Sequence, residues 1–262
     1  MSDKIEAINQ LDFSKSDQYI LSIRLMADGF SFSIFDTTTK KYYLQEEKTD
    51  GSLSLTANIK RLFQELDFLN YSYLQKRVIF TGRRYILLPL ELFEDEQRKT
   101  IFYHSHIKKE NETIRYDIVK ENNLVVLYGI DTSAYKHLKQ WDKNIIISSQ
   151  ISIFIEQLID INRTEDKKQM YIDLHKNRID ILSFDQGALL NINSFTIQSS
   201  ADILYYSLYV WKQLDFDQQT DEYFFLSDST VIQQAIPELK KYIKTVNIFP
   251  DTIPFDFKIE TN

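Results

Sequence analysis

The sequence predicts a mixed α/β (α+β) fold in which two halves of the chain repeat one order of elements. Three observations support this fold class. Short apolar or alternating runs occur in groups of three, as in an antiparallel meander. Each group of three is followed by a segment with apolar residues at helical spacing. After each of these segments comes one more apolar run, of the kind found in buried strands. We therefore expect the order of three strands, helix, strand and helix to occur twice.

The first half begins with a predicted meander whose first corner contains Gly29. Its strands are expected at residues 19–23, 30–35 and 41–45. The next segment has apolar positions at helical spacing, and Ser54 or Thr56 is its expected N-cap, because a hydroxyl can accept a hydrogen bond from the first helical turn. A buried strand at residues 77–81 follows this helix.

The second half repeats this order, with strands expected at residues 170–174, 179–184 and 189–195. Gln186 and Gly187 are expected to form a hairpin turn, because glycine tolerates the positive φ that such turns require. The predicted helix follows Ser199, which has the spacing of a capping box with Asp202. A strand at residues 223–227 comes next.

An insertion interrupts the first half at about residues 85–130. It contains a charged helix, expected at residues 91–104, and two strands, expected at residues 114–120 and 124–130. The two strands are expected to leave an open sheet edge.

An apolar helix expected at residues 150–161 leads into the second half, and the polar residues 162–168 mark the boundary. We therefore predict a first domain at residues 1–166, which includes the insertion, and a second domain at residues 167–262.

The composition excludes several classes of function. The chain has 262 residues and a net charge of −7, so neither nucleic acid nor an anionic membrane surface is expected as a partner. Its five glycines are too far apart for a phosphate-binding loop, and it has no cysteine for a disulfide, a zinc site or a nucleophile. No stretch of about 18 residues is apolar enough to span a membrane, and the first residues lack a signal pattern, so we expect a cytoplasmic protein.

The first hairpin of the second half carries two carboxylates, Asp173 and Asp180, seven positions apart. It resembles the second phosphate-binding loop of actin-like ATPases, in which two Asp residues at this spacing enclose glycines. The repeated order of elements is similar to a duplicated ribonuclease H-like unit, which is the actin-like architecture. His175, Lys176 and Asn177 stand where the resemblance places glycines, and their side chains obstruct the close approach of a phosphate to backbone N–H groups.

Two strings in the first half are similar to those of a bacterial family of unknown function with a degenerate actin-like fold. They are LSIR at residues 21–24 leading to GFSFS at residues 29–33, and ILLP at residues 86–89 before Leu92 and Phe93. The resemblance implies an actin-like ATPase fold of two ribonuclease H-like halves, with an inserted subdomain in the first. It also implies a distant similarity to the actin-like proteins of pilus assembly and cell division.

The resemblance further implies a carboxylate in the first hairpin and a glycine pair after the strand on the adenosine side. Arg24 or Ser22 stands where this carboxylate is expected, and a guanidinium there would repel the Mg²⁺ of a nucleoside triphosphate. Asp228, between two serines, stands where the glycine pair belongs. We therefore expect no catalytic residue and no bound cofactor. The residues of the vestigial cleft are Arg24, Asp173, Lys176, Asp180 and Asp228.

Other interpretations of these residues stay open. Asp173 and Asp180 could be ordinary polar positions of an exposed hairpin. Arg24 and Lys176 could together form an anion pocket. A metal site is not expected. His104 and His106 would point about 200° apart on a helix, and only two further histidines exist to complete a site.

Two groups of side chains are expected at the surface. The first is a solvated basic rim, formed by Lys76, Arg77, Arg83 and Arg84. The second is an aromatic helix face that is too large to bury on one side, so that part belongs to the core and part to an interface; its members are Tyr205, Tyr206, Tyr209 and Trp211.

The residues favour a non-catalytic actin-like module that binds another protein. The alternative is a divergent ATP-binding phosphotransferase or ATPase that uses the inter-domain cleft, and only then would ATP and Mg²⁺ be cofactors. A third possibility is a structural oligomerisation unit. The inserted segment is the expected contact surface for the protein partner, with Arg98 and Lys99 on its charged helix.

Overall fold

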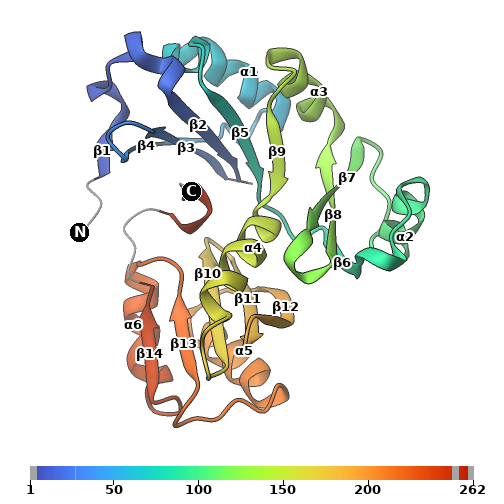
Figure 1. Cartoon of the computed structure of the whole chain (residues 1–262), viewed down its shortest axis with the longest axis vertical. Coiled ribbons are helices and arrows are strands. Elements are labelled where there is room, and N and C mark those ends of the chain that lie inside the picture. Colours follow the sequence, from blue (N-terminus) through green and yellow to red (C-terminus); the bar gives the residue numbers. More distant parts are fainter. Residues whose placement is uncertain (1–4, 27, 250–253, 259–262) are drawn as a thin grey trace. The chain divides into compact units, whose positions relative to one another are not determined.

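The computed structural model describes residues 5–26, 28–249 and 254–258, so Ala27 in the predicted first corner lies outside it. The chain forms two compact units, which are Met1–Ile153 with Asp256–Asn262, and Phe154–Phe255 (Figure 1). The domain boundary expected after residue 166 stays a prediction. No helix within the described ranges is both long and apolar enough to cross a membrane.

The first unit is built on a six-stranded sheet with the order β1-β4-β3-β2-β5-β9. Strands β2, β3 and β4 form the predicted antiparallel meander, and β5 and β9 continue the sheet in parallel. Strands β1 and β9 were not predicted. The bounds are β1 Ile5–Ala7, β2 Tyr19–Leu25, β3 Gly29–Asp36, β4 Lys41–Lys48, β5 Gln75–Phe80 and β9 Ile146–Ser149.

Helices α1 (Leu55–Glu65) and α3 (Thr132–Trp141) contribute to the hydrophobic core of this unit. The hydroxyl of Ser54 accepts a hydrogen bond from the N–H of Ala57 at 3.2 Å, so Ser54 is the N-cap of α1. Helix α3 was not predicted. The apolar helix expected at residues 150–161 is confirmed as α4 (Gln150–Asn162).

The insertion is a small antiparallel sheet with the order β6-β8-β7 and one helix, α2. Phe102 of α2 packs on the sheet residues Ile114, Val125 and Leu127. Of the two predicted strands, β7 is an edge of this sheet, whereas β8 is its central strand and pairs on its other side with β6, which was not predicted. The bounds are β6 Tyr85–Pro89, α2 Arg98–Ser105, β7 Glu112–Val119 and β8 Leu124–Asp131.

The helix expected at residues 91–104 is wrong in its first half, because α2 begins only at Arg98. Phe93 and Glu94 have extended backbones. The ring of Phe93 packs against Tyr116, with 4.6 Å between centroids, and the N–H of Leu90 donates to the carbonyl of Asn123 at 2.7 Å. These tertiary contacts hold the segment outside a helix despite its sequence propensity.

The expected basic rim is also wrong in part, because two of its side chains have partners in the first unit. Lys76 lies over the ring of Trp141, 4.3 Å from its centroid, and pairs with Asp142 at 3.5 Å. Arg84 makes a bidentate ion pair with Glu112 at 2.6 and 2.7 Å.

The second unit contains a five-stranded sheet with the order β12-β11-β10-β13-β14. Its meander and following parallel strands repeat the order β4-β3-β2-β5-β9 of the first unit, which confirms the predicted duplication. The bounds are β10 Gln169–His175, β11 Arg178–Asp185, β12 Ala188–Thr196, α5 Ser200–Gln213, β13 Glu222–Phe225, α6 Thr230–Leu239 and β14 Thr245–Ile248.

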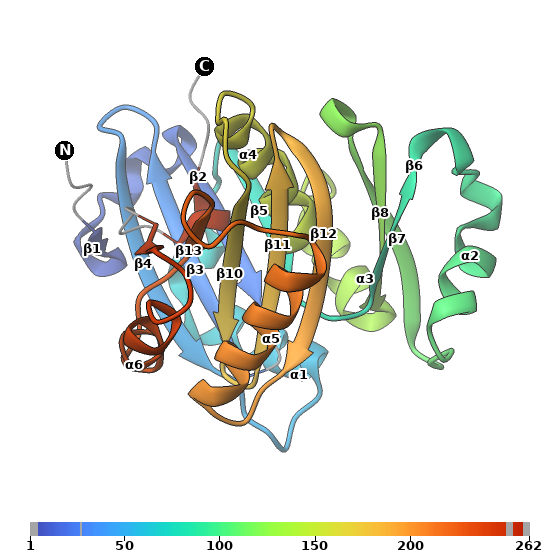
Figure 2. The same cartoon turned by 90° about the horizontal axis from the view of Figure 1, so that it is seen from below.

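Two local features of the second unit confirm the sequence signals. The turn after β11 has φ 49° at Gln186 and φ 80° at Gly187, a conformation that glycine adopts without strain. Helix α5 begins with the capping box of Ser199 and Asp202. It lies across one face of the sheet (Figure 2), where Ile203, Val210 and Trp211 join the core.

Candidate functional site

The hairpin of β10 and β11 places four ionisable side chains on one face of the sheet in the second unit. Asp173 lies directly opposite Asp180, and His175 lies opposite Arg178. Residues two apart on a strand share a face, so the four groups form a compact square. Two carboxylates directly opposite each other repel, and the neighbouring cations offset this repulsion.

Asp180 is the centre of this charge network, and its residue has no exposed surface. Its Oδ2 atom lies 3.0 Å from Nε2 of His175 and 2.9 Å from a guanidinium nitrogen of Arg178. Its Oδ1 atom accepts a hydrogen bond from the hydroxyl of Ser194, the residue opposite it on β12. A buried carboxylate is stable only with such partners. Both oxygens of Asp180 are therefore engaged by the unit's own side chains.

His175 completes the network from the other side, because its Nε2 also lies 3.0 Å from Oδ2 of Asp173. Burial alone would lower the pKa of His175, but the charge of Asp173 and the hydrogen bonds to Asp173 and Asp180 outweigh it and raise the pKa to about 9. His175 is therefore charged at neutral pH. With both carboxylates ionised, the two cations make the square electrically neutral.

The ligand atoms of Asp173, His175 and Asp180 lie within 4.8 Å of one another, so these residues could hold a metal ion. A metal ion would need a neutral imidazole and would have to displace the shared proton. It would also lie close to the guanidinium of Arg178, which pairs with the same oxygen of Asp180. The charges of the four side chains therefore favour a proton on His175 over a divalent cation at this position.

The corner between the two strands consists of Lys176 and Asn177, both exposed. Within the described ranges, neither belongs to the residues with positive φ. The corner therefore lacks the left-handed backbone that glycines allow in a phosphate-binding turn. Asp228 lies elsewhere in the second unit, beside the N-cap of α6, where it accepts a hydrogen bond from Gln233 at 2.8 Å.

Arg24 of β2 is bonded to the C-terminal segment of the chain. Its guanidinium lies 2.8 Å from Oδ1 of Asp256 and 4.7 Å from the ring centroid of Phe257. The amide of Gln150 donates to the other oxygen of Asp256 at 2.9 Å. Asp256 is fully buried. The anion at Arg24 is therefore the chain's own carboxylate, and the joint anion pocket of Arg24 and Lys176 stays a prediction.

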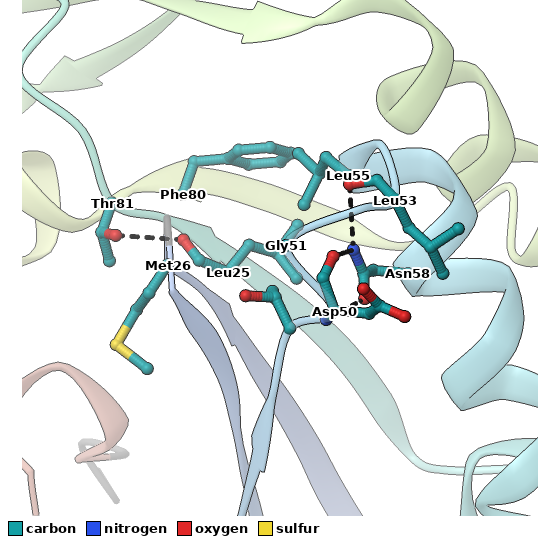
Figure 3. Close-up of a pocket in the computed structure, with 10 residues that line it drawn as sticks. Leu25, Met26, Asp50, Gly51, Leu53, Leu55, Asn58, Phe80 and Thr81 are labelled. Atoms are coloured by element: carbon teal, nitrogen blue, oxygen red, sulfur yellow. Dashed lines mark hydrogen bonds between the residues drawn. The ribbon is translucent and has the colours of Figure 1, made fainter.

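A hollow of about 290 Å³ lies beyond the carboxyl ends of β2 and β5 in the first unit (Figure 3). Two of its polar side chains, Asn58 and Asp50, have hydrogen-bond partners within the unit. Asn58 donates to the carbonyls of Asp50, Leu53 and Ser54, and Asp50 accepts from Ser52. The other lining residues are Thr49, Gly51 and Thr81 and the apolar residues Leu25, Met26, Leu53, Leu55 and Phe80.

The glycines near the first hairpin differ in what surrounds them. A Cβ at Gly29 would lie 2.9 Å from the carbonyl oxygen of Glu47, so this glycine is required by strand packing. A Cβ at Gly51 or Gly82 would meet no atom within 4 Å. At those two positions, no neighbouring atom of the described chain requires a glycine.

The sequence pointed to Asp173 and Asp180 but missed their partners. His175 and Arg178 were recognisable in principle, because a two-residue corner places positions 175 and 178 opposite each other. Ser194 could also have been found from the register of the meander. Asp256 and Gln150 carried no such signal, since Asp256 lies 232 positions from Arg24.

The duplicated units and the aspartate-bearing hairpin define a protein with the actin-like ATPase fold. A Bacteroides thetaiotaomicron protein of unknown function, whose crystal structure has this fold, is 44% identical to this chain, with a TM-score of 0.84 over 91% of this chain and 93% of that one. PilM in the PilM–PilN type IV pilus biogenesis complex is 10% identical, with a TM-score of 0.59 over 88% of each chain, and shows the fold alone.

The chain belongs to the family described as "Protein of unknown function (DUF3822)", which matches residues 8–246. No curated protein matches the chain.

Proposed function

We propose that this protein is a non-catalytic actin-like module with a degenerate nucleotide site, and that it acts by binding another protein. The observation that carries the proposal is the charge network around Asp180. The two aspartates that correspond to those of a phosphate-binding hairpin are neutralised by His175 and Arg178. A Mg²⁺ ion or its water shell would have to compete with two cations for the same oxygens.

The first hairpin supports the same conclusion. Arg24 replaces a carboxylate there and is paired with Asp256, so a phosphate group would have to displace a buried ion pair. The hollow beside this hairpin has no lysine or arginine among its lining residues. A site for a triphosphate instead requires backbone N–H groups, cations or both.

The insertion is the surface that we propose for the protein partner. Ile107 is 88% exposed in the loop after α2, and Leu92 is 65% exposed before it. An open groove of about 500 Å³ beside α2 is lined by Lys99, Lys108 and Lys109, which make no ion pair with any residue in the described part of the chain. In its complex, PilM, which shares the fold, assembles with a second protein.

Mg-ATP at about 5 mM should raise the melting temperature by less than about 2 °C, because a ligand whose Kd exceeds its concentration stabilises by less than RT ln 2. The measurement is a thermal melt with Mg-ATP, Mg-ADP and Mg²⁺ alone. A rise of several degrees with a nucleotide, abolished in Asp173→Ala, would support the ATP-binding alternative.

Charge reversal at Arg98 and Lys99 should weaken the capture of a native partner in pull-downs. Both residues lie on α2, where Lys99 is exposed and lines the groove, and Arg98 precedes it, half-buried and paired with Asp95. The substitution of exposed Lys99 should change the free energy of unfolding by less than about 0.5 kcal/mol. Lys240→Glu is the matched control, because Lys240 is exposed and lies far from the insertion in sequence. If the charge reversals in the insertion leave partner capture intact, but substitutions at Arg24, Lys176 or Asp228 abolish it, the partner binds the vestigial cleft instead.

A further inference from the structure

Strand β12 differs from the other edge strands of the described sheets. An edge strand presents backbone N–H and C=O groups to any strand that can align with it, and proteins protect such edges with charges, proline or short length. Strands β1, β9 and β14 have only 3, 4 and 4 residues. Strand β6 ends in Pro89, and β7 carries Glu112, Arg115 and Asp117.

Strand β12 has none of these protections. It has nine residues, ALLNINSFT, without a charge or a proline. At about 3.4 Å per residue it presents an edge about 30 Å long. Ala188, Leu190, Asn193 and Thr196 are exposed, and the other five residues of the strand are half-buried. Among the described residues, β12 is the outermost strand of its sheet, next to β11 (Figure 1).

An exposed aromatic pair lies beside this edge. Phe195 of β12 stacks on Tyr206 of α5, with 4.4 Å between ring centroids, and Tyr206 contacts Tyr205 at 5.1 Å. Tyr205 and Tyr209 stack on each other and are 64% and 51% exposed. Tyr is enriched at protein interfaces, where its ring is buried and its hydroxyl finds a partner. The edge and the tyrosine pair together form one contact strip.

We propose that two copies of this chain pair through β12, antiparallel about a two-fold axis, so that their second-unit sheets form one continuous sheet. This inference is independent of the proposed partner at the insertion. A strand that pairs with its own copy in antiparallel orientation forms a closed, self-complementary interface. The tyrosine pair of each copy then widens the contact beyond the single layer of the sheet.

The charge of β12 permits a second copy as the occupant of this edge. Each chain carries a net charge of −7, so two copies repel through most of their surfaces. The β12 edge contributes no like charges to a symmetric contact, because all nine of its residues are uncharged.

The test introduces charges on β12 and measures the molar mass of each variant by light scattering after gel filtration. The double variants Leu190→Lys/Asn193→Lys and Leu190→Glu/Asn193→Glu give both copies of a symmetric strand pair two like charges near the middle of the shared edge. Each variant alone should dimerise at least about tenfold more weakly than the wild type, and an equimolar mixture of the two should recover the dimer. Tyr205→Ala/Tyr209→Ala should weaken the dimer as well.

Val231→Lys is the matched control, because Val231 is as exposed as Leu190, at 40%, but lies on α6. It should leave dimerisation unchanged, and circular dichroism melts verify that each variant folds. A wild type that stays monomeric up to about 100 µM, far above the Kd of standard interfaces, overturns the proposal. So does a dimer that persists in both charged variants. The proposal is also overturned if the wild type is a monomer whose β12 binds a strand of a different protein, and if the β12 variants lose that binding.

Discussion

Replacement of Asp180 with alanine should lower the free energy of unfolding of the second unit by about 3–5 kcal/mol. The substitution removes the fully buried carboxylate that both His175 and Arg178 contact. Two buried cations would then share the single carboxylate of Asp173, and the hydroxyl of Ser194 would lose its acceptor. Urea titration followed by circular dichroism and by hydrogen exchange in the second unit measures the loss.

Two further substitutions separate charge from volume. Asp180→Asn keeps the size of the side chain. It should lower the free energy of unfolding almost as much as Asp180→Ala does, because the amide carries no compensating charge. Asp185→Ala, at the far end of β11, removes a partly exposed carboxylate and should cost less than about 0.5 kcal/mol. A loss below about 1 kcal/mol for Asp180→Ala would show that the network is a solvated surface cluster.

Raising the pH from 6 to 10 should remove about 3 kcal/mol of stability that depends on His175. The folded-state pKa of His175 is about 9, above its ordinary value of 6.5. The folded protein therefore holds a proton that the unfolded chain releases between these values. This contribution is fully present below pH 6.5 and is lost as the pH rises through 9.

The measurement compares urea unfolding of the wild type and His175→Gln at several pH values. The difference between the two proteins isolates His175 from other groups that titrate in the alkaline range, and it should shrink as the pH rises. A difference that stays constant from pH 6 to 10 would contradict a charged His175 in the folded protein.

These two results would also bear on the nucleotide site. A network that stabilises the hairpin by several kcal/mol cannot yield its carboxylates to Mg²⁺ without a comparable cost. Both results would therefore support the proposal that this hairpin is a self-contained structural element.

Most of the architecture could be predicted from the sequence, because its signals are local. Alternation with period two predicted both meanders, and helical periodicity predicted α1, α4 and α5. The cap at Ser54 and the capping box of Ser199 and Asp202 involve hydrogen bonds between residues three apart. The turn at Gly187 depends on the conformation of two residues alone.

The errors and omissions lie where distant residues decide the local structure. The segment before α2 is held outside a helix by Tyr116 and Asn123, which belong to the other elements of the insertion. Strand β1, with three residues, is too short for a periodic pattern and exists because it pairs with β4.

For the candidate site, the sequence by itself determined that Asp173 and Asp180 lie on one hairpin and that no glycine separates them. Hairpin register depends only on the positions of the corner residues, so these facts could be predicted. Only the tertiary structure decided that Asp180 is buried among two cations and a hydroxyl, and that Arg24 is paired with Asp256. The charge state and availability of a buried group depend on which side chains the folded chain packs around it, and residues up to 232 positions apart make those contacts here.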